Sequence, residues 1–175
     1  PPPEGLPILD RNAEAVDLIS LGADIGFVCP ELARPARRLA GWLAARLVAT
    51  PDDRRPIHGD FYAGQVLLDG DGVTVFDLDR AALGDPTADL GMFIAHLERD
   101  ALRGALVPDR VAVFAEALLE GYGAVASRPV PARVRLYTAV GLLRLAPEPF
   151  RARESDWPGK TGALLARAAA VAEAG

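Results

Sequence analysis

The chain has 175 residues, a size that suits one domain with a sizeable core, and half of the residues are apolar while a quarter are charged. The formal net charge is −5 and no run of Lys or Arg occurs, which argues against nucleic acid as a partner because such binding depends on neutralising phosphates. Charged residues break the apolar stretches well short of the roughly 20 residues that a membrane-spanning helix needs, so membrane insertion is not expected.

Cys29 is the only cysteine in the sequence. It therefore has no partner for an internal disulfide and no second thiol for a metal-binding pair. This pattern is typical of proteins in a reducing compartment, and we expect a cytoplasmic location.

The chain opens with three prolines, which cannot enter a helix interior or a sheet ladder, so residues 1–7 are expected to be a flexible start. No internal repeat or shift in composition follows, and residues 8–175 are predicted to form a single domain. Apolar periodicity predicts helices, with the first begun by Asp10 as a cap. The predicted helices cover residues 11–20, 33–48, 87–102, 110–122, 132–145 and 160–173.

One segment between these helices has a different pattern. Two runs rich in Val and Leu, residues 66–68 and 73–76, flank Asp69-Gly70-Asp71-Gly72. Apolar runs on either side of an Asp-Gly turn predict a β-hairpin. The fold class is therefore predicted to be mainly α (α+β), a helical bundle with one small hairpin.

Polar residues lie at both outer ends of this hairpin, which the fold of a hairpin brings together. Asp60 and Gln65 precede the first strand, and Asp77 follows the second. Metal-assisted phosphoryl transfer needs a carboxylate to accept the proton of the attacking hydroxyl and oxygen ligands to hold Mg²⁺ against the phosphates. Asp60 suits the first role, and Gln65 with Asp77 suits the second.

The same residues resemble the aminoglycoside phosphotransferase and choline kinase superfamily, whose catalytic loop has the pattern H-x-D-x-x-x-x-N and whose metal aspartate follows a hairpin. His58 and Asp60 match that loop, and Asp77 takes the place of the metal aspartate. Gly84-Asp85-Pro86 with Asp89-Leu90 resembles the family's G-D-P-x-x-D-L. The resemblance implies a protein-kinase-like C-terminal lobe, in which His58, Asp85 and Asp89 hold the loop in shape.

The sequence departs from the family pattern in two places. Gln65 stands where the family has asparagine, which keeps the amide oxygen but adds a methylene. The family's N-terminal lobe, with its phosphate-covering loop and strand lysine, has no counterpart before His58, and Lys160 is the sole lysine. That lobe would have to come from the rest of a longer chain or from another polypeptide.

Other polar and aromatic residues are open to simpler interpretations. Asp79 is either a second metal-side carboxylate or a turn residue, and His96 is expected to be a core or rim histidine rather than a ligand. Phe61 and Tyr62 adjoin Asp60 and are candidates for the substrate pocket. Gly159-Lys160-Thr161 lacks the first glycine of a phosphate-binding loop and is predicted to start a helix.

Taken with the resemblance, these motifs predict a phosphotransferase that moves the γ-phosphoryl group of ATP or GTP, with Mg²⁺, to a hydroxyl of a small molecule such as a sugar, amino sugar or aminoglycoside. The alternative is a non-catalytic stand-alone lobe or pseudokinase that binds a small molecule or a partner protein. An exposed apolar surface at the position of the missing lobe would favour the alternative.

Overall fold

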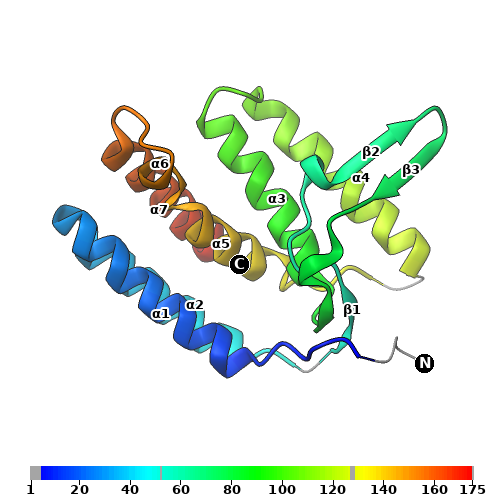
Figure 1. Cartoon of the computed structure of the whole chain (residues 1–175), viewed down its shortest axis with the longest axis horizontal. Helices are drawn as coiled ribbons and strands as arrows, with labels where there is room; N and C mark the ends of the chain where they lie inside the picture. The colour runs from blue at the N-terminus through cyan, green and yellow to red at the C-terminus, as the bar shows by residue number, and fades with distance from the viewer. Residues whose placement is uncertain (1–4, 52, 127–128, 175) are drawn as a thin grey trace.

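The computed structural model describes residues 5–51, 53–126 and 129–174, and these form a set of packed helices with two small sheets (Figure 1). The α-helices are α1 (Arg11–Val28), α2 (Ala33–Val48), α3 (Thr87–Leu102), α4 (Pro108–Ala126), α5 (Val134–Leu145), α6 (Glu148–Arg151) and α7 (Trp157–Glu173). The strands are β1 (Arg55–Ile57), β2 (Val66–Asp69), β3 (Gly72–Val75) and β4 (Ala82–Gly84). The prediction of a mainly helical fold with a small β portion is confirmed.

The first helix is longer than the sequence pattern predicts. It starts after Asp10, whose side chain accepts a hydrogen bond from Asn12 N at 2.8 Å, and it continues past Ser20 to Val28. Gly22 and Gly26 do not break it, because they are the positions where α1 lies closest to α2. A Cβ atom at Gly22 would lie 2.6 Å from the Cβ of Ala40.

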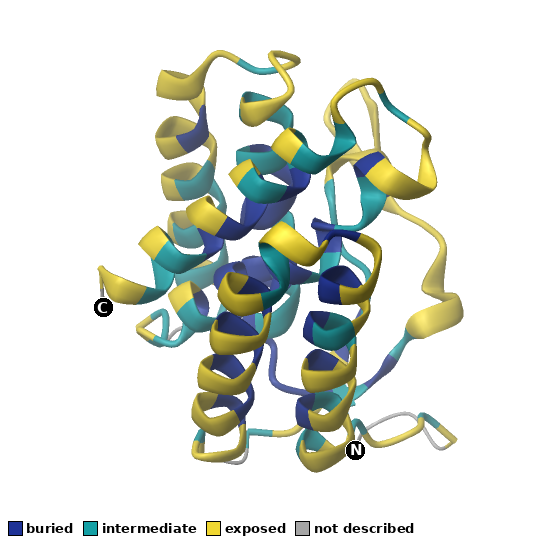
Figure 2. Ribbon diagram, turned by 90° about the vertical axis from the view of Figure 1, so that its left-hand side faces the viewer, coloured by how far each residue is buried: buried dark blue, intermediate teal, exposed yellow. Residues whose placement is uncertain are grey.

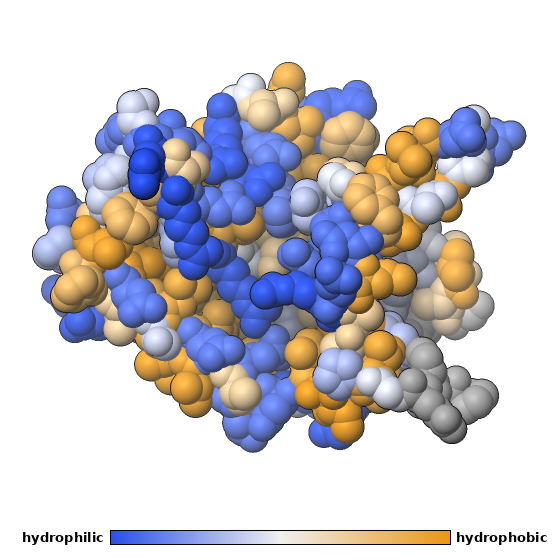
Figure 3. Space-filling model, in the orientation of Figure 1, coloured by the Kyte–Doolittle hydropathy of each residue, from blue (hydrophilic) through white to orange (hydrophobic). Residues whose placement is uncertain are grey.

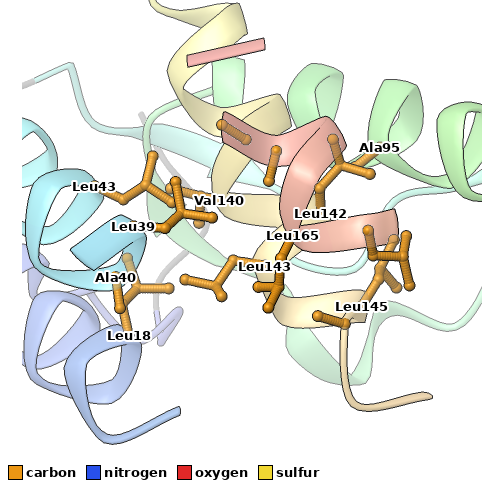
Figure 4. Close-up of a cluster of buried hydrophobic side chains, with 14 of the residues drawn as sticks. Leu18, Leu39, Ala40, Leu43, Ala95, Val140, Leu142, Leu143, Leu145 and Leu165 are labelled. Atoms are coloured by element: carbon orange, nitrogen blue, oxygen red, sulfur yellow. The ribbon is translucent and has the colours of Figure 1, made fainter. Parts of the chain in front are cut away.

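The main core gathers α2, α3, α5 and α7 around one another, with α1 closing one side (Figure 4). Helix α5 is buried on nearly all sides, which agrees with its lack of a polar face. Three of its leucines, Leu142, Leu143 and Leu145, pack against side chains from the other helices. Those partners include Leu18, Leu39, Leu43, Ala95, Leu165 and Ala168.

The hairpin predicted at residues 66–76 is present as β2 and β3, which pair antiparallel from Val66 opposite Val75 to Asp69 opposite Gly72. Gly70 in its turn has a φ of +56°, a conformation that glycine adopts without strain. The second pair, β1 with β4, was not predicted, because strands of three residues carry too little alternation to be recognised.

The segment before α1 is joined to β4. Leu83 N donates to Pro7 O at 2.8 Å, and Leu9 N donates to Leu83 O at 3.0 Å. Residues 1–4 of the predicted flexible start lie outside the described residues. Of the helices that the structure describes, none has the length and apolarity needed to cross a membrane.

The packing of α3 on α5 depends on a glycine, which leads to a first prediction. A Cβ atom at Gly91 would lie 2.5 Å from the Cβ of Tyr137 and 2.6 Å from Thr138 N. Replacing Gly91 by Ala should therefore lower the free energy of unfolding by about 1–3 kcal/mol, the usual cost of overpacking. Chemical denaturation monitored by circular dichroism measures this change.

Gly121 in α4 offers a matched control, because an added Cβ there meets no atom within 4 Å. The Gly121→Ala change should raise stability by roughly 0.5–1 kcal/mol through helix propensity alone. Equal effects of the two substitutions would show that α3 and α5 are not in close contact at Gly91.

Candidate active site

The loop that carries Asp60 is held by the first turn of α3. His58 N and Gly59 N donate to the two carboxylate oxygens of Asp89, at 2.7 and 2.9 Å. Burial raises the pKa of Asp89, and the two backbone donors oppose that shift because they favour the ionised form. A single carboxylate thus fixes the direction in which the chain enters the loop.

The same loop also lies against the segment that follows β3. The ring nitrogen Nε2 of His58 is 2.9 Å from Phe76 O, and Gly59 has a φ of +82°. A Cβ atom at Gly59 would collide with the carbonyl oxygen of Arg80, so only glycine allows this approach. The contacts place half-buried Asp60 beside the backbone that bears Asp77.

Gln65 and Asp77 are brought into direct contact. Gln65 is 4% exposed and its Nε2 donates to Oδ2 of exposed Asp77 at 3.1 Å. The backbones of the same region are joined by Phe76 N, which donates to Gln65 O at 3.1 Å. The two ends of the hairpin therefore meet, as a hairpin requires.

Asp77 has a left-handed backbone, with φ 65° and ψ 59°. Asp tolerates this conformation better than most residues, but it is an uncommon one outside glycine. Left-handed non-glycine residues persist where surrounding contacts determine them, and they are concentrated at functional sites. In this chain the conformation turns the backbone from β3 into the short 3₁₀-helix Leu78–Arg80.

Asp85 is the centre of a buried ionic network under the start of α3. Its Oδ1 accepts from Thr87 N at 3.0 Å and from Thr87 Oγ1 at 2.7 Å, which caps the helix. Its other oxygen accepts from Nε of Arg133 at 2.5 Å, and Arg11 lies 3.7 Å away. Arg133 also donates to Asp53 at 3.0 Å.

Sequence reasoning missed Arg133, which lies 48 residues from Asp85. The hydrogen bond to Asp85 raises the pKa of Arg133 and keeps its charge in place. No local pattern identifies such a residue, because it precedes α5 and meets Asp85 only when α5 packs beside α3. Its role is to support the start of α3, and through it Asp89.

Aromatic rings cover the other side of the loop. Phe61 lies 5.3 Å from Phe93 and 5.6 Å from the ring of His58, measured between ring centroids. Tyr62 stacks on His96 at 4.3 Å with an interplanar angle of 11°. His96 is buried on α3, as expected of a core or rim histidine, and its contact with Tyr62 makes it part of the wall beside Asp60.

The donor set suits a metal held partly by a substrate rather than by the protein alone. Over the described parts of the chain, no group of three or more His, Cys, Asp or Glu side chains could hold a metal ion. Gln65 and Asp77 supply an amide and a carboxylate oxygen within one hydrogen-bonded pair. Mg²⁺ is commonly held by one or two carboxylates together with substrate phosphates, and these residues fit that mode.

The sequence of this chain matches the model of a known protein family. The model of the phosphotransferase enzyme family (APH) matches residues 8–137, which is more than half of the chain. The chain belongs to this family. The resemblance seen in the motifs is thereby confirmed, and the curated proteins contain no significant match.

A solved structure of the same general fold is the choline/ethanolamine kinase family protein from Mesorhizobium loti. It superimposes with a TM-score of 0.60 at 17% sequence identity, over 94% of this chain and 55% of that one. At this identity the likeness shows the fold of a kinase-like phosphotransferase. The chain thus spans little more than half the length of that protein.

His96 leads to a prediction of pH dependence. Burial, with a smaller contribution from Arg99, lowers the pKa of His96 to about 4, against about 6.5 in an unfolded chain. Between these values the unfolded state binds more protons, so His96 should make the protein less stable as pH falls from about 6.5 to about 4. Urea unfolding at pH 7 and pH 5 measures the loss.

The His96→Phe variant, which keeps an aromatic ring against Tyr62, should lose less stability than the natural chain over the same pH interval. The comparison between the two chains removes the contribution of the carboxylates that they share. An identical loss in both would show that His96 is not protonated on unfolding in this range.

Proposed function

We propose that this chain carries the proton acceptor and the metal ligands of a small-molecule kinase. The reaction transfers the γ-phosphoryl group of ATP or GTP to a hydroxyl of a sugar, amino sugar or aminoglycoside, in the cytoplasm. The observation that carries the proposal is the contact between Gln65 and Asp77 beside the loop of Asp60. This arrangement supplies the two kinds of oxygen that phosphoryl transfer requires.

Asp60 is proposed to orient the substrate hydroxyl and accept its proton. The hydroxyl oxygen forms a bond to the γ-phosphorus while the bond from that phosphorus to the β,γ-bridging oxygen breaks, and the nucleoside diphosphate leaves. Asp60 is half-buried and directly follows two backbone amides anchored to Asp89, so its backbone is held in place before substrate arrives. Positioning of this kind supplies much of the catalysis in this reaction class.

Gln65 and Asp77 are proposed to hold Mg²⁺, which neutralises charge on the phosphates of the nucleotide. Asp77 is exposed and offers a carboxylate to the solvent side, while Gln65 is buried beneath it. The amide of Gln65 now points its nitrogen at Asp77, so it would rotate to present its oxygen. Gln has the reach for this because it is one methylene longer than the family's asparagine.

The nucleotide is proposed to bind partly to this lobe and partly to a further lobe, supplied by the rest of a longer chain or by another polypeptide. Strands β2 and β3 project from the helices (Figure 1), and apolar side chains on them are exposed (Figure 3). Monomers rarely leave such patches uncovered unless they are interaction sites. The exposed residues are Leu67, Leu68, Val73, Val75, Phe76 and Leu78.

The same surface supports the second candidate function. A lobe that binds a partner protein through this hairpin, without transferring phosphate, would expose the same residues. The two candidates differ in whether a nucleotide binds next to Asp77, and this difference can be measured on the chain itself.

We expect Mg-ATP or Mg-GTP to release heat on titration into the purified chain, and the signal to disappear in the Asp77→Asn variant because one metal-binding carboxylate is lost. Isothermal titration calorimetry makes the measurement, and circular dichroism checks that both proteins are folded. No binding by the folded natural chain would contradict nucleotide binding by this lobe alone and favour the partner-binding function.

Asp60→Asn provides the matched control. It should bind the nucleotide as the natural chain does, because Asp60 faces the hydroxyl substrate rather than the phosphates. In the presence of the complete nucleotide site, its turnover should fall by roughly 10²–10⁴, the usual contribution of a general base. Equal turnover in both proteins would remove Asp60 from the mechanism.

A further inference from the structure

Arg133 joins two segments that lie at the same end of a short strand pair. Its Nη2 donates to Oδ2 of Asp53 at 3.0 Å and to Oδ1 of Asp85 at 3.2 Å, and its Nε donates to the other oxygen of Asp85. Asp53 precedes β1, and Asp85 directly follows β4. One guanidinium therefore holds the start of one strand close to the end of the other. We call these contacts the Arg133 bridge.

The bridge is anchored in the core. Arg133 directly precedes α5, most of whose residues are buried in the middle of the molecule (Figure 2). Its own side chain is 19% exposed, and its two contacts with Asp85 restrict the direction of the guanidinium. The bridge is thus a fixed point against which β1 is held.

The strand pair β1–β4 is short and depends on contacts outside itself. It has three residue pairs, and the middle one contains Pro56, which has no backbone N–H to donate. An isolated pair of strands is at best marginally stable in water. Contacts at the two ends of the pair therefore decide how firmly β1 is held against β4.

The two ends of this strand pair have different neighbours. One end is closed by the Arg133 bridge. At the other end the chain leaves Ile57 and enters the loop that carries Asp60, where Gly59 packs against the carbonyl group of Arg80. A strand of three residues is about 10 Å long, so the bridge lies close enough to fix the strand from which the loop begins.

We propose that Arg133, by way of Asp53, is a positioning residue for Asp60. The inference rests on the proposed function, in which Asp60 accepts the proton of the substrate hydroxyl. The contact with Asp53 fixes the start of β1, and Asp60 follows three residues after the end of that strand. This route to the loop does not pass through α3, and it makes Asp53 part of the support of the site.

The bridge also supports the loop from a second side. Through Asp85 it holds the start of α3, whose first turn carries Asp89, and Asp89 accepts from His58 N and Gly59 N. These two amides therefore lie between support from β1 and support from α3. Their protection from solvent reports on the bridge without any need for nucleotide or substrate.

Arg133→Lys tests the bridge while keeping a positive charge at the position. A lysine ammonium lacks the guanidinium fork that reaches two carboxylates at once. Asp85 keeps the two hydrogen bonds from Thr87 and has Arg11 at 3.7 Å, so its buried carboxylate retains partners. The variant should therefore fold, and circular dichroism checks this.

Asp53→Ala separates the two routes. It removes the contact of Arg133 with the segment before β1 and leaves the contacts of Arg133 with Asp85 in place. The side chain of Asp53 is 22% exposed, so this variant should also fold. If Arg133 acted through α3 alone, Asp53→Ala would leave the loop unchanged, whereas the proposed bridge requires that the loop loosen.

Arg99, in the last turn of α3, provides a matched control. Its side chain is 14% exposed, and it also reaches two carboxylates, Glu148 at 3.1 Å and Asp100 at 2.8 Å. It lies at the opposite end of α3 from Asp89. Arg99→Lys should therefore lose a comparable set of ionic contacts without any effect on the loop of Asp60.

Turnover measures the consequence for the reaction. With the complete nucleotide site present, turnover at saturating substrate should fall roughly 10–100-fold in Arg133→Lys, because Asp60 is no longer held in position against the hydroxyl. Arg99→Lys should keep the natural turnover. Natural turnover in Arg133→Lys would contradict the positioning role.

Amide hydrogen exchange, followed by NMR on the isotope-labelled chain, tests the bridge directly. The His58 and Gly59 amides should exchange about tenfold faster in Arg133→Lys and in Asp53→Ala, the change expected when one hydrogen bond to a charged group is lost. Amides in the middle of α5 should change less, and Arg99→Lys should leave the His58 and Gly59 rates as they are.

Two results of the exchange measurement would overturn the proposal. Natural rates at His58 and Gly59 in Asp53→Ala would show that the bridge does not hold β1. Equal acceleration of these amides and of those in α5 would show that the variants lower only the stability of the whole chain. The measurement uses no nucleotide, so its outcome is separate from that of the calorimetric titration that tests the proposed function.

Discussion

The carboxylate of Asp89 is the constraint on which the candidate site depends. The loop from His58 to Gln65 contains two glycines and little regular structure, so its own residues do not define its course. Two adjacent amides donate to one half-buried carboxylate, and charge-assisted bonds of this kind are stronger than neutral ones. The loop thereby takes its position from α3, and α3 takes its own from the glycine contact with α5.

A second constraint acts from the hairpin side. The left-handed backbone of Asp77 costs on the order of 1–3 kcal/mol, and it is kept by contacts on both sides of it. Gln65 binds the side chain of Asp77, while Phe76 is joined to both Gln65 and His58. The site is thus assembled where two independently anchored segments meet, which explains why it needs few residues of its own.

The helical core carries an exposed apolar surface beside the candidate site. This surface is the β2–β3 hairpin, which lies next to the loop of Asp60. Ion pairs such as Arg144 with Glu14 and Arg167 with Glu98 join helices around the core. The proposed function uses the hairpin as the place where a further lobe or a partner packs.

Much of the fold and most of the candidate residues followed from local pattern. The helices, the β2–β3 hairpin and the grouping of Gln65 with Asp77 depend on periodicity, turn residues and spacing within about a dozen residues. The predicted end of α1 at residue 20 was wrong. Gly22 and Gly26 allow α1 to pack closely on α2, and the sequence by itself does not distinguish such glycines from those that end a helix. The short pair β1–β4 carried no periodic signal at all.

The amino-acid sequence alone determined the family motif, the fold class and the residues that we propose as proton acceptor and metal ligands, because these depend on residue type and short spacing. Tertiary structure alone decided that Arg133 supports Asp85, that Tyr62 stacks on His96, and that Phe27 stays outside the core. These relations join residues far apart in the chain or on different helices. They arise only when packing has set the distance and orientation between elements, which no local pattern encodes.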